Sequence, residues 1–222
     1  MAITVAAVAE MLALVRARIE RAGGIGVQVM AVTKTFGADA VRAAMAAGCD
    51  SIGENYAQEL VAKFTEVDPR PPVHFIGRLQ SNKVRLVAGV VDVYETIDRA
   101  SLATEVAKRS PGAAVLVQVI TADDDGHVAV DKGGCPLAAA PAIVDACRHL
   151  GLVPLGLMTV GPTASSTATT RSGFASVRAL VDSLGLTVCS MGMSDDLEIA
   201  VGEGSTQVRV GSALFGDRPR FG

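Results

Sequence analysis

Short β-branched segments alternate with alanine-rich helical segments along almost the whole chain. We predict eight strands, at residues 27–33, 51–53, 73–76, 91–96, 113–120, 153–160, 187–190 and 207–210. Each is followed by a helical segment, at residues 38–47, 56–64, 81–87, 99–109, 137–150, 170–184, 195–201 and, as a short final turn, 212–215. Such alternation predicts parallel pairing, because consecutive parallel strands need a crossover connection. Eight repeats of one strand–helix unit predict an α/β fold in which a single (β/α)8 TIM barrel spans residues 1–222.

An open, doubly wound sheet is the alternative architecture. It usually carries a glycine-rich fingerprint after its first strand, whereas here that strand is followed by KTFGAD at residues 34–39. An extra amphipathic helix is predicted ahead of the barrel. Thr4 can cap this helix, and its apolar face repeats at helical spacing through Val8, Met11, Leu12, Val15 and Ile19.

Charge and composition argue against several kinds of partner. The formal net charge is −3 and no basic stripe stands out, so we expect no nucleic-acid partner. No segment is long and apolar enough to suggest a membrane span. The four cysteines form no C-x-x-C pair, which indicates free buried thiols in a cytoplasmic protein, and the three scattered histidines predict no metal site.

Lys34 is the candidate reactive residue. Active sites of such barrels lie at the carboxyl ends of the strands, and Lys34 ends the apolar strand VMAVTK. The other four lysines fall in helical or loop segments. Partial desolvation at the barrel mouth would favour the neutral amine, which attacks carbonyl groups. The alternative is an ordinary lysine that reaches water or pairs with a carboxylate.

The last two strands predict an anion site. Loops after the seventh and eighth strands of these barrels often bind phosphate. Gly192 and Gly211 would let the backbone approach an anion, and Ser194 and Ser212 would donate hydroxyl hydrogen bonds at the starts of two helices. Alternatively, these residues are turns and helix caps. Arg209, inside the last strand, always carries its proton, and one role for it is to donate to an unprotonated ring nitrogen.

An amine and an anion site together predict a phosphorylated aldehyde or ketone as ligand. Asn55, just after the second strand, could bind a ligand oxygen or merely cap the next helix. His74, within the third strand, could be a core residue instead of a ligand contact. Pyridoxal 5′-phosphate (PLP) and a sugar phosphate, as in a Schiff-base aldolase, both fit, and the spacing of the residues does not separate them.

Six segments carry a resemblance that does separate them. They are AVTKTF at 31–36, SIGENYAQE at 51–59, HFIGRLQSNK at 74–83, GLMTVGP at 156–162, SMGMSDD at 190–196 and GSTQVRVGSALFG at 204–216. In order and spacing this set resembles the PLP homeostasis protein family. The chain departs from the common pattern at TFGAD after the lysine, where many members carry a proline, and at Arg78, where histidine is frequent.

The resemblance implies a PLP-dependent fold type III barrel, like the N-terminal domain of alanine racemase, with PLP held as a Schiff base on Lys34. It places Arg209 at the pyridine nitrogen. The remaining implied contacts are Ser194, Gly211 and Ser212 at the phosphate, Ser190 and Met193 along that loop, and Asn55, His74 and Met158 around the ring.

The family is regarded as a PLP carrier or buffer in vitamin B6 and amino-acid balance, with no firm reaction assigned. We therefore expect a non-catalytic monomer that supplies PLP to apo-enzymes. An arginine at the ring nitrogen weakens PLP as an electron sink. A low-activity amino-acid racemase is the alternative, with Tyr56 as a candidate acid or base, although we expect no β domain after the barrel. A sugar-phosphate aldolase is the third possibility.

Overall fold

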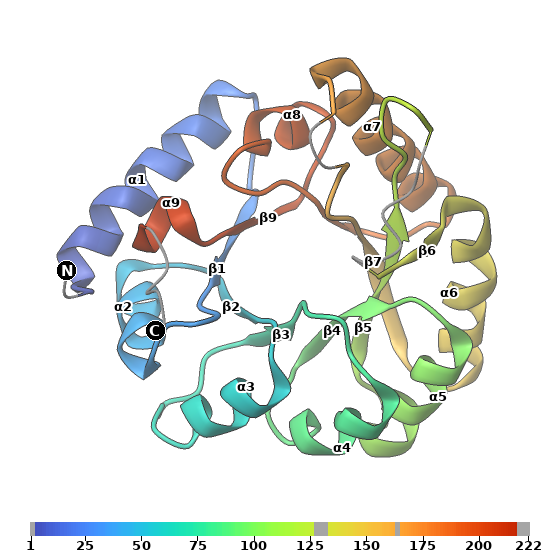
Figure 1. Ribbon diagram of the computed structural model, residues 1–222, viewed down its shortest axis with the longest axis horizontal. Helices are drawn as coiled ribbons and strands as arrows, with labels where there is room; N and C mark the ends of the chain where they lie inside the picture. The colour runs from blue at the N-terminus through green and yellow to red at the C-terminus, as the bar shows by residue number, and fades with distance from the viewer. Residues whose placement is uncertain (1–2, 127–132, 163–164, 217–222) are drawn as a thin grey trace.

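The computed structural model describes residues 3–126, 133–162 and 165–216. Eight parallel strands form a closed barrel in the order β4-β3-β2-β1-β9-β8-β7-β5, and β4 pairs with β5 to complete the ring (Figure 1). These strands are β1 (Gln28–Val32), β2 (Ser51–Glu54), β3 (Val73–Phe75), β4 (Val93–Ile97), β5 (Ala114–Ile120), β7 (Val153–Met158), β8 (Val188–Ser190) and β9 (Gln207–Val210). The predicted barrel is confirmed.

Helices surround the barrel on its outside (Figure 1). They are α1 (Val5–Arg21), α2 (Ala38–Ala47), α3 (Ala57–Phe64), α4 (Val84–Val87), α5 (Ala100–Arg109), α6 (Ala140–His149), α7 (Thr167–Ser183), α8 (Leu197–Gly202) and α9 (Ser212–Phe215), with 3₁₀ turns η1 (Ser81–Lys83) and η3 (Leu137–Ala139) before α4 and α6. Among the described helices, none combines the length and apolarity needed to cross a membrane.

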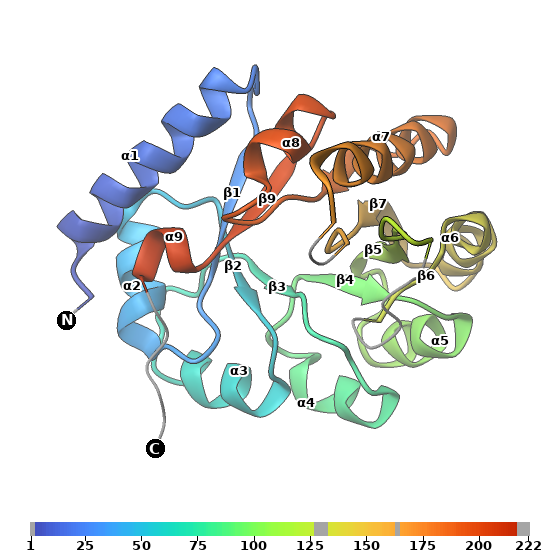
Figure 2. The same cartoon turned by 45° about the horizontal axis from the view of Figure 1, so that its top comes forward.

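The extra N-terminal helix forms as predicted. Thr4 caps α1 by accepting a 3.2 Å hydrogen bond from the amide of Ala7. The helix lies along the outside of the barrel against α2, α8 and α9 (Figure 2). Its buried face consists of Val8, Leu12, Val15 and Ile19. Met11, predicted for that face, is instead 36% exposed, because it lies at the edge of the stripe.

Two connections differ from the sequence-based expectation. Helix α7 begins at Thr167, three residues earlier than predicted, because Ser166 caps it by accepting from the amide of Thr169 at 3.2 Å. The segment after β5 contains the two-residue strand β6 (Cys135–Pro136), which pairs with the carboxyl end of β5. Parts of the connections at 123–134 and 161–170, which the composition of the sequence predicts to be loops, lie outside the described residues, as do His127 and Lys132.

Side chains of the strands alternate between the helices and the barrel interior. Val29 and Ala31 of β1 belong to the hydrophobic shell between strands and helices, whereas Met30 points inward. A Cβ placed on Gly53 of β2 would lie 2.6 Å from the sulfur of Met30, so the missing side chain makes room for the methionine. At this place the interior fills by pairing a large residue with a small one.

Candidate functional site

A cavity of about 290 Å³ opens at the carboxyl ends of β1, β2, β7, β8 and β9. It contains eight of the ten residues predicted to contact the cofactor, namely Lys34, Asn55, Met158, Met193, Ser194, Arg209, Gly211 and Ser212. Val32, Ile76, Val160 and Asp195 complete the lining. With Ile76 after β3, the tertiary structure thus brings residues from six separate strand ends into one pocket, where the amine and the predicted anion site share the same space.

Lys34 follows β1 in a tight turn. The strand ends at Val32, so the lysine is partly buried in the turn instead of being the last strand residue. Its neighbour Thr35 has a φ of +69°, a left-handed conformation that is uncommon for a residue other than glycine. The amide of Thr35 donates to Glu59 at 2.6 Å, which holds this conformation in place.

A buried ion pair holds the other side of the same turn. Lys63 of α3 donates to the carbonyl oxygen of Thr33 at 2.8 Å and to Glu54 at 2.5 Å. The hydroxyl of Thr33 also donates to Glu54, at 2.6 Å. Burial raises the pKa of Glu54, and the charge and hydrogen bond of Lys63 oppose that rise. The residues on both sides of Lys34 are therefore fixed by charged side chains that do not line its cavity.

The predicted anion site is built by two turns that contact each other. The hydroxyl of Ser212 lies 3.1 Å from that of Ser194, and the amide of Ala213 donates to Ser194 at 3.4 Å. Ser212 begins α9 as predicted, but Ser194 lies three residues before α8, in a turn. In that turn the amide of Met193 donates to Asp196 at 2.6 Å, while burial raises the pKa of Asp196.

Glycine occupies the two positions of the anion site, 192 and 211, for different structural reasons. Gly192 has a φ of +95°, and a Cβ there would lie 2.6 Å from the Cβ of Ala200, so the fold itself requires glycine. Gly211 has a negative φ, and a Cβ there would meet the oxygen of Val32 at an ordinary 3.4 Å. Neither backbone conformation nor packing therefore requires glycine at position 211. Because Gly211 lines the cavity, its missing side chain leaves open space there.

Arg209 reaches the cavity from β9 and is 4% exposed. Its guanidinium donates to the carbonyl oxygen of Ser190 at 2.7 Å, to the hydroxyl of Ser190 at 2.8 Å and to the carbonyl oxygen of Thr159 at 2.6 Å. Burial lowers the pKa of Arg209, although Glu95 and Asp196 oppose this with their charges. The side chain is thereby fixed as a charged hydrogen-bond donor at the wall of the pocket.

His74 and Ser190 are the two predicted contacts that do not line the cavity. Both bind Glu95, which is fully buried inside the barrel: His74 Nδ1 lies 2.6 Å from Oε1, and the Ser190 hydroxyl donates to Oε2 at 2.8 Å. Gln207 donates to the same carboxylate at 2.7 Å. Burial would raise the pKa of Glu95, but the bonds and charges of His74, Arg209 and Ser190 outweigh it and lower the pKa.

Asn55 does not serve as the helix cap that the sequence allowed. The first residue outside α3 is Tyr56, and no side chain caps that helix. The side-chain oxygen of Asn55 is buried and has no hydrogen-bond partner in the described part of the chain. A buried acceptor without a donor is costly, which indicates that a ligand or water satisfies it. Tyr56 is 52% exposed and lines a neighbouring cavity, not that of Lys34.

Several residues that organise the site were missed from the sequence. Glu95 and the Lys63–Glu54 pair are buried, and Arg18 of α1 donates to the carbonyl oxygen of Ser194 at 2.8 Å. Glu95 had a local signal, because a charged residue inside the strand VYETI of an all-parallel barrel must find a buried partner. The role of Arg18 had no such signal, since an arginine on an exterior helix is ordinary.

A parallel barrel with a lysine amine and a polar pocket at its mouth corresponds to a known class of domain. Residues 3–219 match the family model described as "Alanine racemase, N-terminal domain". A relative from Pseudomonas aeruginosa, called pyridoxal phosphate homeostasis protein, is 40% identical over 95% of this chain and 96% of its own length. The relative of the same name from Escherichia coli K12 is 36% identical over 86% of each chain.

Solved structures agree with these sequence relationships. The structure of PipY from Synechococcus elongatus, described as having PLP bound, matches with a TM-score of 0.82 and 33% identity, covering 94% of this chain and 100% of that one. The chain belongs to the pyridoxal phosphate homeostasis protein family. The resemblance drawn from the six sequence segments is therefore confirmed.

Proposed function

We propose that this chain binds pyridoxal 5′-phosphate at its barrel mouth, with Lys34 supplying the amine for a Schiff base, and contributes to intracellular PLP balance. The observation that carries this proposal is that Lys34 shares one cavity with Ser194, Gly211 and Ser212. PLP combines an aldehyde that condenses with an amine and a phosphate that needs such donors. The PLP-bound structure of PipY and the relative named pyridoxal phosphate homeostasis protein, both matched over nearly their full length, support the same function.

The residues present fit the cofactor. The open space at Gly211 would accept the phosphate beside the two serine hydroxyls, and the buried oxygen of Asn55 would accept from a donor on the ring or its substituents. Arg209 would donate to the pyridine nitrogen. His74 and Ser190 would act from behind the cavity wall, because they hold Glu95 and Arg209 in place.

We propose a carrier role in preference to catalysis. Arg209 already donates to three acceptors and keeps its proton, so it would leave the ring nitrogen unprotonated and the cofactor a weaker electron sink. A racemase also needs a second acid or base facing the lysine, and Tyr56 lines a different cavity. As a carrier, the protein would transfer PLP to apo-enzymes. It would act as a monomer, with the whole chain forming one PLP-binding domain.

The four free, buried cysteines fit a reducing, cytoplasmic setting.

Mass spectrometry after borohydride reduction tests the attachment site. The protein is mixed with PLP, reduced and digested, and we expect the phosphopyridoxyl group on the peptide that contains Lys34. Lys34→Ala should lose the adduct, whereas Lys108→Ala, which removes an exposed lysine, should keep it. An adduct that persists elsewhere in Lys34→Ala would contradict the proposal. Turnover of L- to D-amino acids at ~1 per second or faster would favour the racemase instead.

A further inference from the structure

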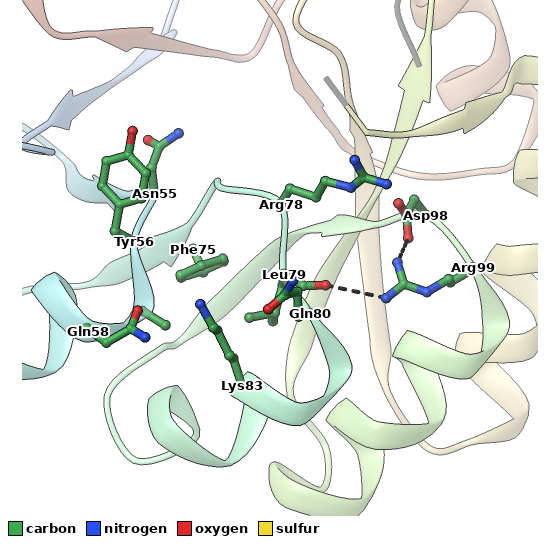
Figure 3. Close-up of a pocket in the computed structure, with 11 residues that line it drawn as sticks. Asn55, Tyr56, Gln58, Phe75, Arg78, Leu79, Gln80, Lys83, Asp98 and Arg99 are labelled. Atoms are coloured by element: carbon green, nitrogen blue, oxygen red, sulfur yellow. Dashed lines mark hydrogen bonds and ion pairs between the residues drawn. The ribbon is translucent and has the colours of Figure 1, made fainter. Parts of the chain in front are cut away.

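A second and larger cavity lies beside the proposed cofactor pocket. Its volume is about 640 Å³, within the range of small-molecule sites. It is formed where β2 and β3 lead into α3 and α4 and where β4 leads into α5, and Figure 3 shows the side chains around it. Asn55 belongs to both linings, while the remaining ten residues of this cavity do not line the first.

The lining carries an excess of positive charge. The lining contains three cationic side chains, Arg78, Lys83 and Arg99, and one carboxylate, Asp98, which binds Arg99 at 2.5 Å (Figure 3). Arg99 also donates to the hydroxyl of Ser81 at 3.3 Å. The side chains of Arg78 and Lys83 make no hydrogen bond or ion pair with any residue that the structure describes. Two positive charges of the lining therefore remain uncompensated.

The cavity also offers apolar and amide surfaces. Tyr56 and Phe75 contribute aromatic side chains and Leu79 an aliphatic one, while Gln58 and Gln80 add amide groups. In Figure 3 the amine of Lys83 points toward Phe75 and the space between the two strand ends. A bare inorganic ion would use the cations and leave the apolar wall uncovered. An organic anion uses both, because its apolar body can cover the aromatic rings while its charged group meets the cations.

The wall between the two cavities is closely packed. A Cβ on Gly77 would lie 2.0 Å from the carbonyl oxygen of Asn55, so the turn after β3 packs directly on the end of β2. Such close backbone contact fixes Asn55 between the two spaces. A ligand in the larger cavity would thus lie one side chain away from the pocket of Lys34.

We propose that this cavity binds a small organic anion, whose phosphate or carboxylate group is attracted by the unpaired charges of Arg78 and Lys83 and whose apolar body lies against Tyr56, Phe75 and Leu79. The site is distinct from that of the cofactor and does not depend on PLP binding. Phosphate and carboxylate are both anionic hydrogen-bond acceptors that the two cations can bind. Phenyl phosphate therefore serves as the probe for a phosphate ligand and benzoate as the probe for a carboxylate ligand. Phenol, which is neutral, is the comparison.

Residue-resolved NMR titration of the PLP-treated protein tests this site. We expect phenyl phosphate, benzoate or both to shift the backbone amides of residues 55–58 and 78–83 in a saturable way, and phenol to bind at least about tenfold more weakly. Shifts around residues 192–194 and 211–212 would report the other pocket separately, so the test is valid even if PLP does not bind.

Paired charge-removal variants decide the outcome. Arg78→Ala combined with Lys83→Ala should weaken probe binding at least about tenfold, and each single variant should weaken it in part. Arg85→Ala combined with Lys108→Ala removes the same charges from exposed positions outside the cavity and should leave binding unchanged. Equal weakening in both pairs, or no saturable shift at residues 78–83 with millimolar probe, would overturn the proposal.

Discussion

The side-chain nitrogen of Lys63 donates a 2.8 Å hydrogen bond to the carbonyl oxygen of Thr33, the residue immediately before Lys34. Lys63 is 6% exposed and lies 2.5 Å from the fully buried carboxylate of Glu54. Glu59, in turn, accepts from the amide immediately after Lys34. A charged cluster behind the barrel wall thus holds the backbone on both sides of the proposed reactive amine.

Removal of Lys63 should therefore harm both the fold and the turn. Lys63→Met leaves Glu54 buried without its partner, and we expect unfolding free energy to fall by about 3–5 kcal/mol, measured by urea titration. Glu54→Gln combined with Lys63→Met removes both charges and should recover most of that loss. The double variant should still bind PLP several-fold more weakly, because Thr33 is no longer held. Wild-type stability in Lys63→Met would contradict this account.

Glu95 should make stability depend on acidity. Its pKa is lowered in the folded state, so it stabilises the fold fully above the ordinary glutamate value of about 4.3, and this contribution is lost as pH falls through the lowered value. Glu95→Gln should cost about 1–3 kcal/mol at neutral pH and show a shallower loss of stability in acid. Urea unfolding between neutral and acidic pH measures both. Glu10→Gln, at an exposed position, should follow the wild type throughout.

The two glycines of the anion site should respond differently to alanine. Gly192→Ala forces a side chain into a left-handed backbone and against Ala200, so the melting temperature should fall. Gly211→Ala meets no such obstacle and should melt like the wild type. It should nevertheless bind PLP at least about tenfold more weakly in spectroscopic titration, because the methyl group occupies space proposed for the phosphate. Full PLP affinity in Gly211→Ala would argue against that placement.

The four thiols should be unreactive in the native protein. Burial raises the pKa of Cys49, Cys135 and Cys147 to about 11 and that of Cys189 to about 12, so few thiolates exist at neutral pH. We expect a thiol-specific chromogenic reagent to label the native protein slowly and all four thiols rapidly in denaturant. Rapid labelling of one cysteine under native conditions would show that its site opens locally.

Local patterns in the sequence were sufficient for most of the architecture. The strand 207–210 and the helices 38–47 and 212–215 were predicted to the residue, because apolar periodicity and glycine or proline boundaries act over short distances. The start of α7 was misplaced, since Ser166 competes with several neighbouring hydroxyl residues as a cap. The strand β6 had no signal of its own, because two residues are too few to show a period.

The residues of the candidate site likewise fall into those that the sequence predicts and those that only the tertiary structure shows. Lys34, Arg209 and the glycine and serine residues of the last two turns could be named from their places at strand ends. The location of His74 and Ser190 behind the wall could not, because their side chains respond to Glu95, which lies on another strand. The cavity around Arg78 and Lys83 also depends on three loops meeting in space.

The sequence by itself determined the barrel, its extra helix, the family and the amine at the end of the first strand, because periodicity and motif spacing are properties of the chain alone. Only the tertiary structure decided which polar groups pair inside the barrel, which glycine is required by the fold and which leaves space, and where unpaired positive charge collects. These depend on distances between residues far apart in the chain, and it is closure of the barrel that sets those distances.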